Sequence, residues 1–196
     1  MISILDYGMG NIQSVYNAFK FLGAETKFIK PEEISKAKVL VFPGVGAFKD
    51  TLELIEPYKK ELIKYLNSGK PFLGICIGLQ FLYEASDENK KYPGIGFFKG
   101  KVTRLKSKNL PQIGWNKLIV KQKNPILKNV KTGDFVYYIN SYATSPQKAL
   151  ATSRYNNEFA AVVNNGNVFA TQFHPEKSGR VGLIILKNFI EVTRCL

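Results

Sequence analysis

The sequence predicts an α/β fold with an open, mostly parallel central sheet, flanked by helices and extended by an antiparallel portion. In the first half, short apolar runs alternate with glycine-rich turns and segments of helical periodicity, which is typical of βαβ units. The run at 39–42 is apolar throughout, as expected of a strand covered on both faces. In the second half, short alternating runs and an Asn-Gly turn indicate antiparallel strands.

The elements of the first half follow one another with short turns. The first strand is expected at 2–6, and a glycine-rich turn at 7–11 leads into a helix. Ile12, Val15 and Phe19 recur at helical spacing up to Leu22, and Gly23 ends that helix. Further strands are expected at 26–29, 39–42 and 71–75, and helical segments at 31–34, about 48–55, 58–67 and 77–83.

The second half is expected to be mainly antiparallel. The turn at 164–167 (NNGN) is a strong hairpin signal between two apolar runs. Strands are expected at 101–105, 117–120, 135–139, 149–155, 159–163 and 168–173, and a closing helix at 181–192. Without an internal repeat or a linker, residues 1–196 are expected to form a single domain.

Composition excludes several classes of protein. With 45% hydrophobic and 22% charged residues, the 196-residue chain resembles soluble globular proteins. No apolar run reaches the ~18 residues of a spanning helix, and the start of the chain is expected to be a strand, not a signal peptide. The net charge is +13, but no Lys/Arg block reaches five residues, so we expect no nucleic acid; a solvated lysine-rich surface or an acidic patch on a partner protein explains the charge.

The numbers of cysteines and histidines limit which kinds of site the chain can form. The two cysteines, Cys76 and Cys195, cannot form a disulfide framework, and a reducing cytoplasm is the expected location. With a single histidine, His174, no metal site is expected. The sequence also lacks a complete nucleotide-binding loop, so no cofactor is predicted.

The segment 74–80 (GICIGLQ) is the sharpest local motif. A buried strand ends, Cys76 stands at the turn, and a helix begins at once, with small residues two positions before and after it. This is the nucleophile-elbow pattern with cysteine in place of serine. The helix N-terminus favours a thiolate. The alternative is a buried structural cysteine between strand and helix.

A nucleophilic cysteine needs a base, and His174 is the only imidazole. It follows an expected strand, where active-site loops gather in open α/β sheets. Glu176 lies two residues on, across a proline, and can orient the ring. Taken singly, His174 could be a structural residue; together with the elbow cysteine, the pattern favours nucleophilic catalysis.

Acyl transfer also needs donors for the oxyanion. The loop 43–46 (PGVG) follows the third strand, and its glycines leave backbone N–H groups free around Val45 and Gly46. The amide of Ile77, next to the nucleophile, is the other candidate. An ordinary turn between strand and helix is the alternative for this loop.

Together these motifs resemble the class I, triad-type glutamine amidotransferases. The two signatures are 74–80 (GICIGLQ) and 173–178 (FHPEKS). The segments 6–11 (DYGMGN), 43–46 (PGVG) and 114–116 (GWN) are similar to the glutaminase subunits of imidazole glycerol phosphate synthases. The resemblance runs from residue 4 to residue 191 and implies a flavodoxin-like fold.

The resemblance implies that Cys76 attacks the carboxamide of glutamine, that His174 shuttles the proton and that Glu176 orients His174. Ammonia would pass to a (β/α)8-barrel cyclase subunit in a heterodimer of histidine biosynthesis, which makes imidazole glycerol phosphate and an aminoimidazole carboxamide ribonucleotide. Further positions match the family's oxyanion strand (Val45, Gly46, with Ile77), its glutamine-binding residues (Gly44, Gln80, Glu88, Ser141, Tyr142) and its partner interface (Asn11, Trp115, Tyr137, Lys177). Trp115 and Tyr137 could instead be core aromatics, and Lys177 a solvated lysine.

Two departures from the family pattern leave other functions open. Asn140 precedes the Ser141–Tyr142 pair where the family usually has histidine, and Gln112 stands near a position that is often histidine. One alternative is a paralogous subunit that supplies ammonia for surface-sugar amidation. A second is a stand-alone triad-type γ-glutamyl hydrolase, which the segments 6–11 and 114–116 disfavour. A third is a non-catalytic regulatory or binding protein, which the intact Cys76, His174 and Glu176 disfavour.

Overall fold

The central element is an eight-stranded sheet with the order β2-β1-β3-β4-β13-β12-β11-β8. The computed structural model describes residues 1–44, 48–88 and 93–194. The parallel strands are β2 (Thr26–Ile29), β1 (Ile2–Leu5), β3 (Val39–Phe42), β4 (Phe72–Ile75) and β13 (Val168–Thr171). Antiparallel strands β12 (Asn157–Asn165), β11 (Ala151–Tyr155) and β8 (Ile119–Val120) continue the sheet. The predicted open, mostly parallel sheet with an antiparallel portion is confirmed.

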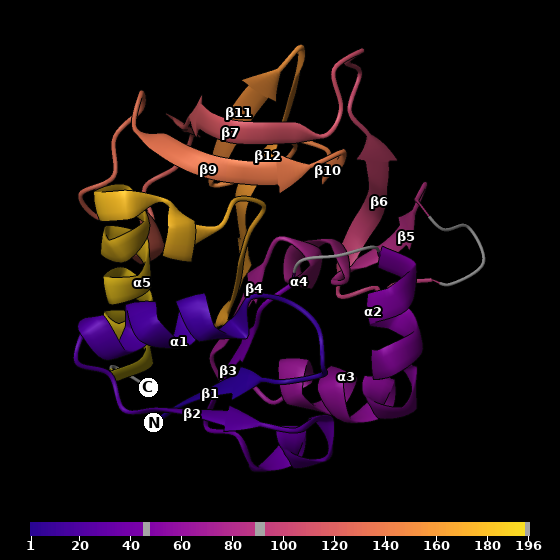
Figure 1. Ribbon diagram of the computed structural model, residues 1–196, viewed down its shortest axis with the longest axis vertical. Coiled ribbons are helices and arrows are strands. Elements are labelled where there is room, and N and C mark those ends of the chain that lie inside the picture. The colour runs from indigo at the N-terminus through magenta and orange to yellow at the C-terminus, as the bar shows by residue number, and fades with distance from the viewer. Residues whose placement is uncertain (45–47, 89–92, 195–196) are drawn as a thin grey trace.

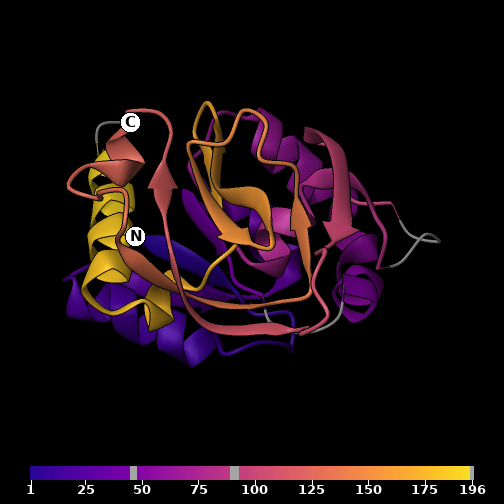
Figure 2. The ribbon, with the colours of Figure 1, turned by 90° about the horizontal axis from the view of Figure 1, so that it is seen from above.

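Helices cover both faces of this sheet, as Figure 1 and the view from above in Figure 2 show. On one face lie α1 (Ile12–Phe21) and α5 (Gly179–Arg194); on the other lie α2 (Phe48–Ile55) and α3 (Lys59–Asn67), with the short α4 (Ile77–Gln80). Single 3₁₀ turns are η1 (Pro31–Lys36), η2 (Glu56–Tyr58), η3 (Pro125–Leu127) and η4 (Pro175–Lys177). In the described part of the chain, no helix combines the length and apolar character needed to cross a membrane.

Burial follows from this layering. Strands β1, β3, β4 and β13 are buried at every residue because helices cover both sides of them. Alternate side chains enter two separate cores: Val41 packs with α1 and α5, whereas Leu40 and Phe42 pack with α2 and α3.

Two smaller sheets complete the fold. One has the order β10-β6-β5, with β10 (Tyr142–Thr144), β6 (Phe98–Arg104) and β5 (Tyr83–Ser86). The other is an antiparallel ribbon of β7 (Gln112–Lys117) and β9 (Phe135–Asn140). We call the latter the β7–β9 ribbon; in Figure 1 it lies across the top of the molecule, above α5.

Several predicted elements differ in extent. The helix expected at 77–83 ends at Gln80, and Tyr83 already belongs to β5. Phe81, Leu82 and Tyr83 are all buried, so helical and strand periodicity cannot be told apart there. The strand expected at 117–120 is divided, because β7 ends at Lys117 and β8 joins the central sheet. Strands β5 and β10 and residues 112–116 of β7 were not predicted.

Candidate active site

Cys76 stands in a strained turn between β4 and α4. Its backbone has φ 54° and ψ −100°, a conformation that costs about 1–3 kcal/mol for a non-glycine residue. The turn is tight because glycines flank it: a Cβ on Gly74 would lie 2.6 Å from the carbonyl oxygen of Gly78, and a Cβ on Gly78 would lie 2.3 Å from that of Phe42. The elbow geometry predicted from the motif is therefore present.

The strands that lead to Cys76 and His174 end side by side. In the parallel pair β4 and β13, Ile75 lies opposite Thr171, and the Cys76 N–H donates to the Thr171 carbonyl at 2.7 Å. The residues after both strands therefore leave the sheet at its carboxyl edge, where open α/β folds place their sites. This topology brings together two segments separated by almost one hundred residues of sequence.

His174 and Glu176 form a buried pair. The His174 Nδ1 lies 2.8 Å from the Glu176 Oε1, and their side chains are 1% and 2% exposed. The backbone around them is fixed, because the His174 N–H donates to the Tyr137 carbonyl on β9 and the Ser178 hydroxyl donates to the His174 carbonyl. The other ring nitrogen, Nε2, is buried and makes no hydrogen bond of standard geometry within the described structure.

The charges around the imidazole favour its protonated form. Burial by itself lowers the pKa of His174, but the charge and hydrogen-bonding capacity of the adjacent Cys76 sulfur and of the Glu176 carboxylate outweigh this effect and raise the pKa to about 10. A thiolate–imidazolium pair is the form of this site suited to nucleophilic attack.

A cavity of about 310 Å³ opens beside Cys76. Its lining contains six of the predicted site residues and three others: Cys76, Ile77, Gln80, Glu88, Ser141 and Tyr142, with Pro111, Ile139 and Asn140. Gln80 Nε2 donates to the Tyr142 carbonyl at 3.0 Å, whereas its Oε1 is buried without a partner in the described structure. Burial raises the pKa of the Glu88 carboxyl at the same cavity.

The loop predicted to hold oxyanion donors is described only in part. Gly44 packs so closely against the elbow that a Cβ there would lie 2.6 Å from the Ile77 Cβ. The Tyr7 hydroxyl donates to the Pro43 carbonyl at 2.9 Å. Val45 and Gly46 lie outside the described residues.

The four residues expected at a partner interface lie apart from the cavity lining. Trp115 and Tyr137 face each other across the β7–β9 ribbon, with ring centroids 5.8 Å apart. Lys177 follows Glu176 in η4, and Asn11 caps α1 by accepting from the Ser14 N–H. Trp115 is 55% exposed, which rules out the alternative of a core residue.

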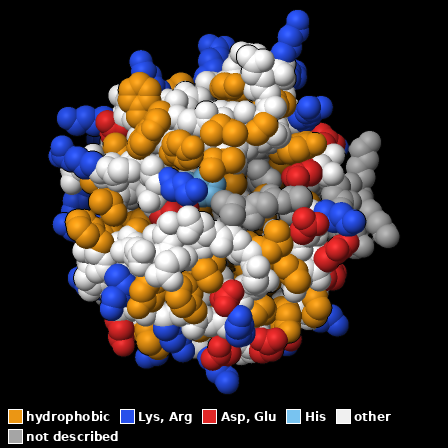
Figure 3. Space-filling view, in the orientation of Figure 1, with side chains coloured by type: hydrophobic (Ala, Val, Ile, Leu, Met, Phe, Trp, Pro, Cys, Tyr) orange, Lys and Arg blue, Asp and Glu red, His pale blue; other side chains and the backbone are white. Residues whose placement is uncertain are grey.

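The outer face of the β7–β9 ribbon is mainly apolar, with the exposed Lys117 at one end beside Phe135. Because strand side chains alternate, Gln112 and Tyr138 point inward, while Ile113, Trp115 and Phe135 are 63%, 55% and 48% exposed. We call these three residues the apolar strip. In Figure 3 apolar side chains gather above the single histidine, drawn pale blue.

The two departures from the family pattern are cross-strand neighbours. Gln112 on β7 lies opposite Asn140 on β9, and both side chains are buried. The Asn140 Nδ2 donates to the Tyr142 carbonyl at 3.0 Å. Asn140 therefore supports the same backbone carbonyl that Gln80 holds.

One residue of this site, Gln172, is not among the site residues predicted from the sequence. It is fully buried, and its Nε2 lies 3.7 Å from the Cys76 Sγ. A signal was available, because Gln172 lies in the strand expected at 168–173 and stands two residues before His174, the spacing of side chains on one face of a strand.

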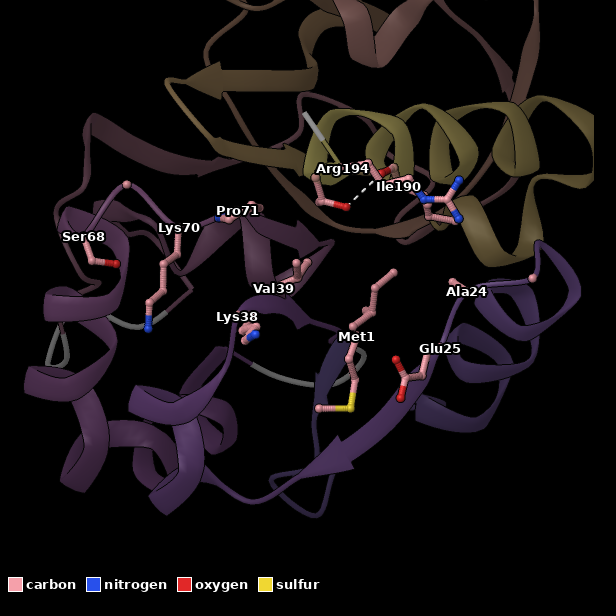
Figure 4. A pocket seen from close by; sticks show the side chains of 14 residues that line it. Met1, Ala24, Glu25, Lys38, Val39, Ser68, Lys70, Pro71, Ile190 and Arg194 are labelled. Carbon is pink, nitrogen blue, oxygen red and sulfur yellow. Dashed lines mark hydrogen bonds between the residues drawn. The ribbon is translucent and has the colours of Figure 1, made fainter. Parts of the chain in front are cut away.

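A larger cavity, about 660 Å³, lies at the opposite end of the sheet (Figure 4). Lys38, Lys70 and Arg194 line it together with Glu25 and Met1. The described residues that line it include neither a cysteine nor a histidine, so the smaller cavity beside Cys76 is the candidate active site. Within 1–44, 48–88 and 93–194, no cluster of three or more metal-ligating side chains occurs.

The chain matches known proteins along its whole length. Residues 3–192 match the family model "Glutamine amidotransferase class-I". A relative from Caldanaerobacter subterraneus, named imidazole glycerol phosphate synthase subunit HisH, is 46% identical, with 100% of each chain covered. The protein of that name from Methanocaldococcus jannaschii is 37% identical, covering 98% of this chain and all of the relative.

Solved structures agree on the fold. A glutamine amidotransferase structure superposes with a TM-score of 0.76 at 21% identity, covering 98% of both chains. A glutamine amidotransferase from Thermotoga maritima gives a TM-score of 0.63 at 18% identity, covering 99% of this chain and 82% of that one.

Proposed function

The chain belongs to the class-I glutamine amidotransferases, and among them to the HisH family, and from this premise we propose that it hydrolyses glutamine at Cys76 for a synthase partner. The single observation that carries the proposal is the placement of Cys76. Its strained elbow lies beside the buried His174–Glu176 pair and opens into a cavity suited to a small substrate.

The first half of the reaction forms a thioester. The Cys76 thiolate attacks the carboxamide carbon of glutamine, and the negative charge moves to the carboxamide oxygen. Imidazolium His174 then donates its proton to the departing nitrogen, and ammonia leaves. Glu176 holds Nδ1 so that Nε2 faces the sulfur and stabilises the positive charge on the ring.

The second half returns the enzyme to its starting state. His174 removes a proton from water, the hydroxide attacks the thioester, and glutamate leaves as the sulfur recovers its electron pair. The sum is glutamine and water giving glutamate, ammonia and the proton that the new γ-carboxylic acid loses. These steps use side chains, backbone groups and water, and a reducing cytoplasm would keep the Cys76 thiol available.

Backbone and polar groups around the cavity would hold the substrate. We assign the oxyanion to the Ile77 N–H and to the 45–46 segment. The unpartnered Gln80 Oε1 and the Glu88 carboxylate can accept hydrogen bonds from the substrate's ammonium group, with Ser141, Tyr142 and Gly44 contributing the rest of the glutamine site.

We further propose that a (β/α)8-barrel cyclase docks on the apolar strip and receives the ammonia. An exposed group of large apolar side chains is typical of a protein interface. Tyr137, Lys177 and Asn11 would extend this surface next to the active site. The names of the relatives support a histidine-biosynthesis partner that makes imidazole glycerol phosphate over one for surface-sugar amidation.

The proposal is tested with the complex of this chain and the cyclase. Cys76→Ala should abolish glutamine-dependent synthesis, while ammonia-dependent synthesis by the cyclase survives. The matched control is Cys195→Ser, which changes the other cysteine and should leave both activities intact. A Cys76→Ala complex that released glutamate from glutamine at the wild-type rate would overturn the proposal.

A further inference from the structure

Gln172 lies immediately after β13 and contacts the sulfur of Cys76. Its side chain is fully buried, and its Nε2 donates to the Cys76 Sγ at 3.7 Å. The contact follows from the fold, because β4 and β13 are paired and their next residues, Cys76 and Gln172, leave the sheet together. The proposed steps of glutamine hydrolysis do not use the Gln172 side chain.

A neighbouring amide fixes the orientation of Gln172. Its Oε1 accepts a hydrogen bond from the Gln80 Nε2 at 3.2 Å, and Gln80 donates its other N–H to the Tyr142 carbonyl. Turning the Gln172 amide over would place two NH₂ groups against each other and an oxygen against the sulfur. The hydrogen-bond network therefore presents a donor to Cys76.

One hydrogen-bond acceptor and one hydrogen-bond donor thus face the Cys76 sulfur. The Ile139 carbonyl oxygen lies 3.8 Å from the Cys76 Sγ and can accept only from the protonated thiol. The Gln172 N–H bonds most strongly to the anionic thiolate, since hydrogen bonds to charged acceptors are about twice as strong as neutral ones. If the Gln172 amide were lost, the Ile139 carbonyl would remain at the sulfur without the opposing donor. The protonated thiol would then be favoured, because it can donate to that carbonyl.

We propose that Gln172 is a positioning residue that stabilises the Cys76 thiolate and joins it to the glutamine-binding residue Gln80. The inference rests on the proposed function, because it explains how the nucleophile is kept charged in a buried site. Gln80 holds Gln172 through its Nε2, and its own Oε1 is buried without a partner in the described structure.

The test measures the thiolate directly, in the full chain carrying Cys195→Ser, so that Cys76 is the only thiol. The rate of alkylation by iodoacetamide is followed against pH for this background and for Gln172→Met, which has a similar length and no donor. The midpoint should rise by about one pH unit or more, because a hydrogen bond to a charged group is lost. Gln122→Met is the control, since its amide also donates one hydrogen bond, to the Ala149 carbonyl.

The same variants are then assayed as complexes with the cyclase. Gln172→Met should lower kcat for glutamine hydrolysis by roughly 10-fold at pH values below the alkylation midpoint, and by less above it, with a smaller change in KM. Gln172→Leu repeats both measurements, and thermal unfolding identifies which variant is folded. An unchanged alkylation midpoint in a folded variant overturns the inference. This holds even if KM rises, because a higher KM alone would mean only that Gln80 has lost its hydrogen-bond partner.

Failure of the inference and failure of the proposed function give different results. If Cys76→Ala abolishes hydrolysis and the midpoint does not move in the Gln172 variants, only the role of Gln172 is wrong. If Cys76→Ala remains active, the proposed nucleophile is wrong whatever the alkylation profile shows.

Discussion

The Nδ1 of His174 lies 2.8 Å from the Oε1 of Glu176, and both side chains are almost completely buried. A proline separates the two residues, so the turn between them is restricted. The pair fixes one ring nitrogen and leaves the other, Nε2, buried without a hydrogen bond of standard geometry in the described structure. Substitutions of His174 and of Glu176 should therefore reduce activity to different extents.

His174→Ala should reduce glutamine hydrolysis by the complex at least ~10²-fold, the usual scale of general acid–base catalysis. No second imidazole exists in the chain to replace it. Glu176→Gln should cost less, because an amide still provides a hydrogen-bond acceptor for the ring. Steady-state kinetics check this order; a Glu176→Gln complex slower than His174→Ala would reverse the assigned roles.

The single histidine makes the protonation of the site measurable by NMR without mutagenesis. With the pKa raised to about 10 from 6.5, the imidazole should stay protonated from pH 6 to pH 8, and its signals should not titrate there. Because the folded pKa is raised, the stability contribution of this proton is complete below 6.5 and is lost as pH rises through about 10.

The role of Cys76 in this shift is tested by Cys76→Ser, which removes the thiolate. The pKa of His174 should fall, because one of the groups that raise it is gone while the burial that lowers it remains. A titration step near pH 6.5 in the unmodified chain would contradict a thiolate–imidazolium pair.

The elbow depends on the absence of a side chain at residue 78. Gly78→Ala should lower the free energy of unfolding by about 3 kcal/mol, since the new Cβ would press on the Phe42 carbonyl. Gly166→Ala is the control: its φ is +57° with open space around it, so only about 1 kcal/mol is expected. Urea unfolding measures both, and equal losses would argue against close packing at the elbow.

Binding of the cyclase should depend on the apolar strip. Trp115→Ala should raise the Kd of the complex by about 30-fold, which corresponds to about 2 kcal/mol for an interfacial aromatic anchor. Phe21→Ala is the matched control, because Phe21 is 78% exposed on α1, outside the β7–β9 ribbon. Calorimetric titration compares the two; similar affinities for both variants would place the interface elsewhere.

Much of the fold could be predicted because its pattern is local. The alternation of buried strands with amphipathic helices appears in the sequence as apolar runs such as 39–42, and the Asn-Gly turn marks the β12–β13 hairpin. The ends of Ile119–Val120 and Tyr83–Ser86 could not be predicted, because pairing with the partner strands β11 and β6 decides them and not a local pattern.

Some residues of the candidate site could likewise be predicted from the sequence, and others could not. Cys76, His174 and Glu176 are visible because the elbow and the strand end are short motifs with a chemical reason. The contact between Gln172 and Cys76 depends on the pairing of β4 with β13, and the opposing Ile139 group is a backbone carbonyl that no residue type reveals. Such contacts become visible only when the sheet order is known.

The central claim is that Cys76 is the nucleophile, and covalent trapping tests it most directly. The complex is incubated with a chloroketone analogue of glutamine, digested and examined by mass spectrometry. The account predicts one adduct, on the peptide that contains Cys76, that glutamine prevents and that is absent in Cys76→Ala. An adduct on Cys195 alone, or equal labelling of both cysteines that glutamine does not prevent, would contradict it.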